Sequence, residues 1–349
     1  MPGFQNYHVP ADEDGATLPA ALRKFLPKLS WTQVKGLIKS RRVQVNGNLC
    51  LDESRRVKEG DVVKVWEHAL AKPADVSKVR IVHFDEHLVI VHKPAGVTTL
   101  RHPEERNWPA RRKQMQPTLD ELVPLVLAKK LGIAVPQPET SQQRPKRREV
   151  RGRKQQARGP KLPWVRAVHR LDRDTSGLMV FARTPQVETE LIRLFSKHKI
   201  ERAYIAVVHG RVEAQTIDTW LVRDRGDGLR GSSPLGEAAE GAQRAITHVK
   251  PIEHFGGYSV VECRLETGRT HQIRIHLSEI GHMLCGEKTY THPLGGDSTS
   301  DTSGAPRQAL HAAELGFVHP ITGQALRVRS QLPRDLADWL LRLKAGGKT

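Results

Sequence analysis

The sequence predicts a protein of two domains, each built from both helices and strands. The chain has 349 residues, whereas one domain commonly takes about 100–200. Residues 17–69 alternate between helix-like and strand-like stretches, and strand-like runs prevail after residue 79. Between them lies a stretch that contains Pro73 and has no periodic pattern. We therefore predict a first domain at 15–70, a linker at 71–78 and a second domain at 79–349.

The charge of the chain predicts a polyanionic partner. Lysine and arginine number 56 against 38 aspartates and glutamates, which gives a formal net charge of +18. Such a protein is attracted to phosphates and displaces their counterions. Nucleic acid is the partner that fits best, and we expect no membrane partner, because the sequence contains no lysine-rich amphipathic helix with an aromatic apolar face.

The sequence shows no pattern for a membrane span or for export. Apolar runs such as Leu88–Val91 and Leu178–Ala182 are far shorter than the ~20 residues of a membrane-spanning helix. Residues Met1–Asp14 are polar and acidic, unlike a signal peptide. The three cysteines lie far apart, which fits a reducing compartment better than a disulfide framework. We therefore predict a cytoplasmic protein.

The 17 histidines do not predict a metal site. His271 and His276 are five positions apart and have no matching cysteine or carboxylate pattern. The sequence has no Cys-x-x-Cys pair. We therefore predict neither a metal nor a cofactor.

The first domain is predicted to begin with two helices. Apolar residues from Leu18 to Leu26 keep helical spacing, and Ser30 is a typical N-cap for a second helix whose apolar stripe runs from Trp31 to Ile38. Short strands follow at 43–45 and 62–66. Four cations lie on or just after the second helix: Lys35, Lys39, Arg41 and Arg42. They form either a solvated face or a surface that binds phosphates.

The second domain is predicted to open with strands at 79–84 and 88–92. Lys93 follows at the strand end, where it either approaches the partner or is simply solvated. The polar stretch 100–116 is predicted to be a loop. Thr118 and Glu121 then form the pattern of a capping box for a helix that ends near Lys130.

A long charged segment interrupts the second domain. From Ile133 to Pro163 almost no residue suits a core, and nine of the eighteen residues from Arg144 to Lys161 are lysine or arginine. Such a segment cannot offset the entropy lost on ordering, so we predict a disordered insertion at about 133–163. It is either an arm that grasps the polyanion or a solubilising linker.

Helices and strands continue after this segment. Thr184 is a typical cap for a helix with an apolar stripe from Val187 to Phe195, and a strand follows at 204–208. Further strands are predicted at 245–250 and 258–265, and a helix at 271–280 ends at Gly281. Residues 211–243 predict no clear element.

One polar turn between strand-like runs is the best candidate for a site. Residues 168–177 hold two aspartates and two arginines, and the apolar run 178–182 follows. Sites are commonly placed where a rigid strand meets a loop. Because nearby cations favour the ionised form of a carboxylate, Asp172 is a candidate nucleophile or base. The alternative is a salt-bridged surface turn, with Thr175-Ser176-Gly177 as turn residues.

Four motifs occur in a fixed order along the second domain. They are His169-Arg170-Leu171-Asp172 with Thr175-Ser176-Gly177, then Glu201-Arg202-Ala203-Tyr204, then Gly268-Arg269-Thr270-His271-Gln272-Ile273-Arg274, and last Leu310-His311-Ala312 before His319-Pro320. Together they resemble the signature of the RluA-type pseudouridine synthases, over a range from about Val79 to Leu332. The first of them alone is a weak signal, whereas four in order are a strong one.

The first domain carries a resemblance of its own. Its second helix ends in cations, and the Val-x-Val-Asn-Gly hairpin at 43–47 and a strand that begins after Gly60-Asp61 follow. This order is similar to the alpha-L RNA-binding domain first known from a small-subunit ribosomal protein.

The resemblance implies an α+β fold: a catalytic domain on a mixed, largely antiparallel sheet, and a small α/β RNA-binding domain. It implies an isomerase that turns specific uridines of RNA into pseudouridine without a cofactor. Ribosomal RNA is the expected substrate, because an appended alpha-L domain is typical of members that act there, and transfer RNA is the second choice. A non-catalytic RNA-binding protein, such as a ribosome assembly factor, is the alternative. The protein is expected to be a monomer.

The resemblance also implies roles for single residues. Asp172 is the catalytic carboxylate, Arg274 pairs with it, and Tyr204 stacks on the target base. Arg170 fills the space that a flipped uridine leaves. Residues expected to line the pocket or to hold phosphate are Arg269, Thr270, His271 and Gln272, and those expected to contact phosphate from the first domain are Lys35, Lys39, Arg41 and Arg42. Where the family usually has Gly-Asp before a tyrosine, this chain has Gly286-Glu287, which keeps the charge on a longer arm.

Overall fold

The computed structural model describes residues 4–46, 48–67, 69, 78–101, 103–107, 116–135, 161–293 and 296–346. The chain splits into two compact units, Met1–Pro73 with His102–Pro117 and Ala74–Arg101 with Thr118–Thr349. Nearly all of the predicted linker at 71–78 and most of the predicted insertion at 133–163 lie outside the described residues.

The first unit holds a four-stranded antiparallel sheet in the order β1-β4-β2-β3. The strands are β1 (Phe4–His8), β2 (Val43–Val45), β3 (Asn48–Leu49) and β4 (Val62–Trp66). Helices α1 (Leu18–Phe25) and α2 (Trp31–Lys39) pack apolar residues into its core, as the sequence predicts. The predicted stripe of α2 is wrong at its first residue, because Trp31 is 52% exposed. The predicted cap of α2 is confirmed, because Ser30 Oγ accepts a hydrogen bond from the backbone nitrogen of Gln33.

The sheet of the first unit begins at Phe4, ahead of the predicted domain start at residue 15. Strand β1 pairs with β4 along its whole length, from Phe4 opposite Trp66 to His8 opposite Val62. Its sequence gave little sign of a strand, because an edge strand buries few side chains and Phe4 and Tyr7 are here only half-buried.

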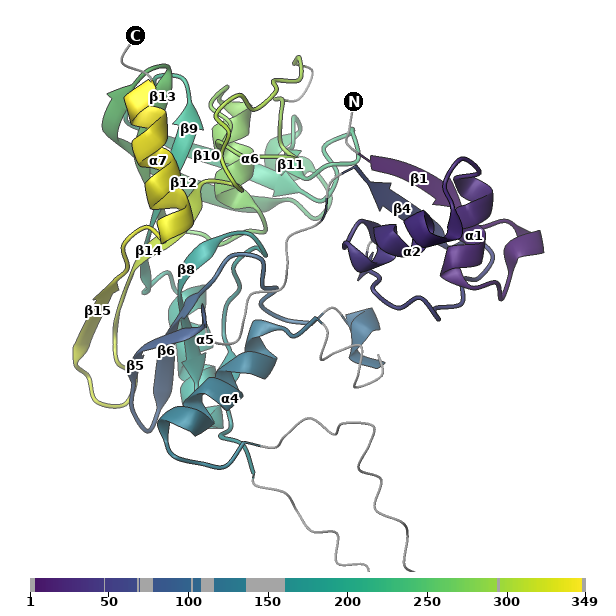
Figure 1. Ribbon diagram of the computed structural model, residues 1–349. Helices are drawn as coiled ribbons and strands as arrows, with labels where there is room; N and C mark the ends of the chain where they lie inside the picture. Colours follow the sequence, from purple (N-terminus) through teal and green to yellow (C-terminus); the bar gives the residue numbers. More distant parts are fainter. Residues whose placement is uncertain are drawn as a thin grey trace, which may run out of the picture. The chain divides into compact units, whose positions relative to one another are not determined.

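The second unit is built on an 11-stranded sheet (Figure 1). Its order is β11-β10-β12-β13-β9-β14-β8-β6-β5, with β15 paired to β14 and β7 paired to β8. Among the described strand pairs, β14 and β8 run parallel and all others are antiparallel. The prediction of an α+β fold on a mixed, largely antiparallel sheet is therefore confirmed.

The strands of this sheet are β5 (Arg80–Phe84), β6 (Leu88–Lys93), β7 (Arg166–Ala167), β8 (Ser176–Ala182), β9 (Glu201–His209), β10 (Gln215–Val222), β11 (Gly231–Ser232), β12 (Gln243–Phe255), β13 (Tyr258–Leu265), β14 (Leu310–Val318) and β15 (Ala325–Arg329). The helices are α4 (Leu119–Lys130), α5 (Pro185–Ser196), α6 (Gln272–Glu279) and α7 (Arg334–Gly346). Short 3-10 turns occur at Ala11–Glu13, Pro103–Asn107 and Gly236–Ala238.

Alternate residues of a strand face opposite sides of its sheet, and β9 follows this rule. Tyr204, Ala206 and Val208 pack into one cluster with apolar residues of α4 and α6. Val207, which faces the other side, packs with α7. The side chain of Tyr204 therefore lies on the same face of the sheet as α6.

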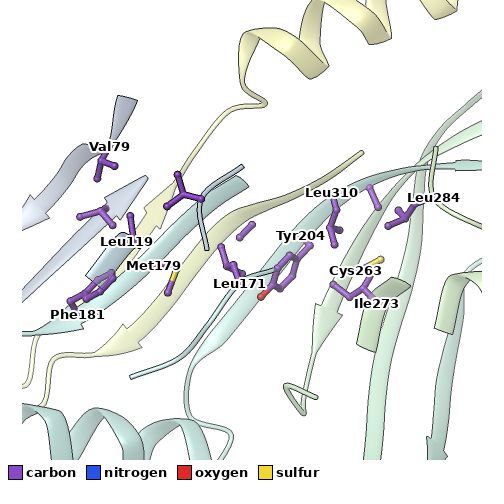
Figure 2. Close-up of a cluster of buried hydrophobic side chains, with 14 of the residues drawn as sticks. Val79, Leu119, Leu171, Met179, Phe181, Tyr204, Cys263, Ile273, Leu284 and Leu310 are labelled. Carbon is purple, nitrogen blue, oxygen red and sulfur yellow. The ribbon is translucent and has the colours of Figure 1, made fainter. Parts of the chain in front are cut away.

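The largest buried cluster among the described residues lies between the central strands and helices α4 and α6. Polar residues next to it in the sequence are held in position by its packing. Figure 2 shows it extending from Val79 through Met179 and Leu171 to Tyr204 and Ile273. Because Leu171 is buried in this cluster, the next residue, Asp172, is held at its edge.

Three predicted helices of the second unit are confirmed. Helix α4 starts at the predicted position, and Glu121 accepts a hydrogen bond from the backbone nitrogen of Thr118. Helix α5 has its predicted cap, because Thr184 Oγ1 accepts from the backbone nitrogen of Val187. Helix α6 ends just before Gly281, which adopts a positive φ of 83°.

The region 211–243, for which the sequence predicts no element, contains β10 and β11. Strand β10 was hidden because most of its outward residues are polar and only part of it is buried. Helix α7 was not predicted, although Leu336, Trp339 and Leu340 have helical spacing and are buried.

Gly177 permits the close contact between the parallel strands β8 and β14. It pairs with Ala312 and has a φ of 125°. A Cβ atom at this position would lie 2.3 Å from the carbonyl oxygen of Ala312, so only glycine fits. The glycine of the Thr-Ser-Gly motif is thus required by packing as well as by the turn.

No helix in the described part of the chain combines the length and the apolar character needed to cross a membrane.

Candidate active site

The polar turn that carries Asp172 lies directly before β8 and is held in place by hydrogen bonds from Lys93. The ammonium of Lys93 donates hydrogen bonds to the carbonyl oxygens of Pro94 at 3.1 Å, Arg173 at 2.9 Å and Thr175 at 2.7 Å. Three acceptors match the three hydrogens of an ammonium group. The backbone nitrogen of Gly96 also donates to the Arg173 carbonyl.

Lys93 is fully buried, and both sequence expectations for it, an approach to the partner and simple solvation, are therefore wrong. Burial lowers its pKa to about 7, against the attraction of Asp174 and Asp172. The sequence did not reveal this, because the acceptors Arg173 and Thr175 lie 80 and 82 positions away. Lys93 is a structural residue whose side-chain nitrogen fixes the turn through these hydrogen bonds.

Arg274 connects the turn to α6. Its Nη1 donates to Asp172 Oδ2 at 3.1 Å. The other edge of the guanidinium is held by Glu287, with Nε to Oε2 at 2.8 Å and Nη2 to Oε1 at 2.7 Å. Such a two-point contact fixes the plane of an arginine. Glu287 therefore aims Arg274 at Asp172.

Glu287 is itself held in place by the backbone that follows it. Its Oε1 accepts from the backbone nitrogens of Lys288 at 3.0 Å and Thr289 at 2.9 Å. Burial favours the neutral form of this carboxyl, but the hydrogen bonds and charge of Arg274 outweigh burial, so the pKa of Glu287 lies below its usual value. The same carboxylates raise the pKa of Arg274 even though its burial opposes this, and the guanidinium stays charged.

Tyr204 lies in the middle of β9, between Cys263 of β13 and Ala312 of β14. It is 7% exposed, and burial raises the pKa of its hydroxyl, with a contribution from the nearby charge of Asp172. Its hydroxyl is therefore protonated near neutral pH. Asp172, Tyr204 and Arg274 line one cavity.

His271 stands at the start of α6 with a left-handed φ of 60°. Its Nδ1 hydrogen-bonds with the hydroxyl of Tyr290 at 2.7 Å, and its Nε2 lies 3.8 Å from Asp172 Oδ1. Burial lowers the pKa of His271, although Asp172 opposes this shift. Because this imidazole is neutral near neutral pH, it does not act as a second positive charge beside Asp172, in addition to Arg274.

The cavity at this turn has a volume of about 500 Å³. Besides the three residues named above, its lining includes Arg170, Arg202, Gly268, Arg269, His271 and Gln272. Arg170 is exposed. His169 is used within the protein, because its Nε2 accepts a hydrogen bond from the backbone of Val180 and its ring stacks on Phe195.

The residues of the Gly-Arg-Thr-His-Gln motif differ in role: Gln272 holds the protein structure, whereas Arg269 is exposed. Gln272 is buried, and its amide is occupied by protein partners: Oε1 accepts from Thr267 and Arg269, and Nε2 donates to Ile246 and Thr247. It holds the start of α6 in place and has no free donor for a ligand. Arg269 is exposed, and its Nε donates to the carbonyl of Arg244 at 3.0 Å.

A second, smaller cavity of about 180 Å³ shares Arg269 with the first. Thr270 lines this second cavity and does not line the first. Arg223 and Arg230 also line it, and both come from the hairpin between β10 and β11. The sequence analysis missed these two arginines because it predicted no element there.

The four predicted cations of the first unit differ in exposure. Lys35 and Lys39 lie exposed on α2 and share Glu53 as an ion-pair partner, at 3.7 Å and 3.2 Å. Arg41 is buried, with a φ of 65°, contrary to the exposed position expected of it. Arg42 donates from Nε to the carbonyl of Trp66 at 2.8 Å. The phosphate contacts expected of Arg41 and Arg42 stay predictions.

Two family models match the chain. One, described as RNA pseudouridylate synthase, matches residues 87–279, and the other, described as S4 domain, matches residues 18–63. The chain belongs to the RNA pseudouridylate synthase family. The predicted family and the predicted RNA-binding domain are both confirmed, and the enzyme is an isomerase that acts on RNA.

Relatives of this synthase cover nearly all of its length. The protein named ribosomal large subunit pseudouridine synthase D from Neisseria meningitidis serogroup B is 32% identical over 348 residues, which cover 97% of this chain and 82% of the relative. Its namesake from Zymomonas mobilis is 34% identical and covers 92% of both chains. The one from Escherichia coli O157:H7 is 30% identical and covers 95% of this chain and 91% of the relative.

Two solved structures share the fold of the synthase. Human RNA Pseudouridylate Synthase Domain Containing 4 aligns with a TM-score of 0.53 at 20% identity, over 75% of this chain and 92% of that chain. Human RNA Pseudouridylate Synthase Domain Containing 1 aligns with a TM-score of 0.52 at 21% identity, over 77% and 90%. At these identities the likeness concerns the fold.

One group of possible metal ligands occurs among the described residues of the synthase: His209, Cys285 and Asp301, with ligand atoms within 4.8 Å of one another. Asp301 Oδ1 already hydrogen-bonds with His209 at 2.9 Å and accepts from Ser303. Burial raises the pKa of the Cys285 thiol to about 12, so it is protonated near neutral pH. We assign this group to hydrogen bonding within the protein.

Proposed function

We propose that this synthase converts specific uridines of large-subunit ribosomal RNA into pseudouridine, with Asp172 as its catalytic carboxylate. The observation that carries the proposal is the contact of 3.1 Å between Arg274 and Asp172, which joins two separate motifs at the wall of one cavity. The choice of ribosomal RNA is supported by the names of the relatives and by the S4 domain.

The reaction breaks the bond between the ribose and N1 of uracil, turns the base and joins C5 to the same ribose carbon. Its site needs a carboxylate that can attack or stabilise the sugar or the base, and a pocket that retains the freed base. Asp172 is 17% exposed, so it is open to a ligand in the cavity. Arg274 keeps this carboxylate oriented for the reaction.

Tyr204 is proposed to stack on the target base from its place in β9. A buried aromatic ring whose hydroxyl stays protonated suits this role. After the new bond forms, C5 must lose its proton. Tyr204 lines the same cavity, and because its hydroxyl is protonated, it can take this proton only while it passes its own to another acceptor, such as the Asp172 carboxylate.

The target base must leave the RNA helix to reach this cavity, at a cost of a few kcal/mol. Arg170 is proposed to fill the vacated space, because it is exposed and lies two residues from Asp172. Arg269, Thr270 and His271 are proposed to hold the strand beside the flipped nucleotide. Lys35 and Lys39 on α2 are proposed to contact phosphates from the S4 domain, where their charge steers binding without reading sequence.

We further propose that the synthase works as a monomer in the cytoplasm. The candidate catalytic residues all come from one chain and line one cavity, so a second copy is not needed to complete the site. Ribosomal RNA is the expected substrate in that compartment.

The test is to incubate the protein with transcribed large-subunit ribosomal RNA and to map pseudouridine at single-nucleotide resolution. Product at a few discrete positions supports the proposal. Product on transfer RNA alone moves the substrate to that class. Tight binding without product supports the alternative of a non-catalytic RNA-binding protein.

A further inference from the structure

Arg202 is a buried cation that has no carboxylate partner within the described part of the chain. It lies on β9, two residues before Tyr204, and is 9% exposed. Its Nη2 donates to the backbone carbonyl of Glu266 at 3.1 Å, whereas its Nε is enclosed and makes no hydrogen bond. A buried charge without a counter-charge is costly to the folded state.

Two acids lie close to Arg202 but have other partners: Glu201, its neighbour in the sequence, and Glu266, whose backbone carbonyl it contacts. Glu201 forms an ion pair with Arg327, and the carboxylate of Glu266 pairs with His248 at 2.7 Å. Burial accordingly lowers the pKa of Arg202. Within the described part of the chain, no carboxylate therefore forms an ion pair with this guanidinium.

The guanidinium of Arg202 reaches the wall of the active-site cavity at Gly268. Arg202, Gly268 and Asp172 all line that cavity. A Cβ atom on residue 268 would lie 2.6 Å from Arg202 Nη1, so the glycine leaves this edge of the guanidinium uncovered. Nη1 has no hydrogen-bond partner among the described residues. Unlike Nε, it is not completely enclosed by protein.

Packing explains part of this arrangement. The guanidinium carbon of Arg202 lies 5.6 Å from the ring centre of Phe195, a distance at which a cation is attracted by an aromatic face. This contact helps to hold the guanidinium beside the ring. It does not supply the missing negative charge or a partner for Nη1.

We propose that Arg202 binds a backbone phosphate of the RNA substrate, at the nucleotide whose base enters the cavity. The inference rests on the proposed function and adds a binding site to it. A phosphate fits because it carries the full negative charge that a base carbonyl lacks, and because the arginine fork bonds two of its oxygens at once. The exposed Arg170 and Arg269 at the same cavity provide a path for the strand toward it.

The test compares Arg202→Met with Arg211→Met. Methionine keeps the apolar bulk of Arg202 without its charge. Arg211 is a matched control, because its side chain is 74% exposed and paired with Glu213 and it does not line the cavity. The measurements are the affinity for transcribed large-subunit ribosomal RNA, and the Tm in sodium phosphate and in sodium chloride at equal ionic strength.

We expect Arg202→Met to bind the RNA about 10- to 100-fold more weakly, as for the loss of one charged hydrogen-bonded contact. We expect its Tm in chloride to equal or exceed that of the unaltered protein, because the unbalanced buried charge is gone. The gain in Tm from phosphate should shrink in Arg202→Met and stay unchanged in Arg211→Met.

The phosphate-dependent gain in Tm decides the question. Equal gains in Arg202→Met and in the unaltered protein overturn the proposal, and so does an unchanged affinity for RNA. A variant that does not fold also counts against it, since Arg202 would then be a structural residue. If the unaltered protein makes no pseudouridine but the phosphate effect depends on Arg202, the binding site stands and the proposed function falls.

Discussion

Arg274 of α6 donates a hydrogen bond to Asp172 in the turn before β8, 102 positions earlier in the chain, over 3.1 Å. The two residues belong to different motifs, and the fold brings them to one cavity. The contact orients the carboxylate, and Asp172 remains accessible at 17% exposure. An accessible, oriented carboxylate is what covalent or electrostatic catalysis at the ribose or the base requires.

Replacement of Asp172 by asparagine should abolish pseudouridine formation. Asparagine keeps the size of the side chain but removes the negative charge and the nucleophilic oxygen. Affinity for RNA should change by less than about threefold, because a carboxylate contributes no attraction to phosphate. Product should be measured by mapping pseudouridine, and affinity by filter binding.

The matched control is Asp174→Asn, in the same turn. Its carboxylate neighbours Lys93 but does not pair with Arg274. We expect it to retain most of the activity. Equal losses in both variants would mean that the net charge of the turn matters and not one carboxylate.

Glu287→Gln should lower the rate at saturating RNA by about 10- to 100-fold and leave the KM nearly unchanged, as expected for the loss of a group that orients another. The amide would place a donor against Arg274, which already donates at 2.7 Å and 2.8 Å to Glu287. Arg274 would then no longer be held toward Asp172. Glu287→Asp, which restores the acid on a shorter arm, should recover part of the rate, and failure of this rescue would assign Glu287 to structure alone.

The same pair predicts how stability depends on pH. Arg274 holds the pKa of Glu287 in the folded protein below its ordinary value of 4.5, although burial alone would raise it. The ionised carboxylate therefore stabilises the fold above about pH 4.5, and this stabilisation is lost as the pH falls through the lower folded pKa. The difference in Tm between the unaltered protein and Glu287→Gln should be constant from pH 6 to 8 and shrink below about pH 4.5. A difference that persists unchanged at pH 3 would contradict this.

Much of the site could be predicted because its motifs are contiguous in the sequence. The residues Asp172, Tyr204 and Arg274 were named from three short motifs, and their cavity forms because β8, β9 and α6 surround one buried cluster. Helix starts were predicted well, because a cap such as Ser30 or Thr184 acts through residues three positions away.

What the sequence could not predict depends on partners far along the chain. Lys93 is buried because carbonyls 80 and 82 positions away accept its hydrogens. In the motif Glu201-Arg202-Ala203-Tyr204, only the tyrosine was given a role from the sequence. Only the three-dimensional structure shows that Arg202 is buried without a complete set of partners. Strand β1 was missed because an edge strand of polar residues has no apolar alternation to detect.

Arg223→Gln and Arg230→Gln should each weaken the salt dependence of RNA binding. In the β10–β11 hairpin, Val222 lies opposite Gly231. Arg223 follows Val222 and Arg230 precedes Gly231, so the same register places them opposite each other. Like charges that face each other are unfavourable unless an anion lies between them. Neither arginine forms an ion pair with a described carboxylate: Asp227 and Glu279 pair with Arg225, and Asp224 accepts from the backbone of Gly226 and Gly228.

Each variant should therefore reduce the slope of log affinity against log salt by about 0.7, the value for one phosphate contact of a single strand. Arg211→Gln is again the control and should leave the slope close to its original value. Slopes that are identical in all four proteins would exclude a phosphate contact in the second cavity.

Lys93→Met should impair the enzyme although Lys93 does not line the cavity. The substitution removes the Lys93 donor from the carbonyls of Pro94, Arg173 and Thr175, of which Arg173 keeps the backbone nitrogen of Gly96 as a partner. Each buried acceptor that is left unsatisfied costs about 1–3 kcal/mol. We expect a Tm lower by several degrees and a rate at saturating RNA reduced by at least about tenfold, because the turn no longer fixes Asp172. The exposed Lys197→Met is the control for loss of charge. If Lys93→Met is destabilised but keeps its full rate at a temperature where it is folded, the turn does not need this anchor, and the apolar contacts of Leu171 alone hold Asp172 in place.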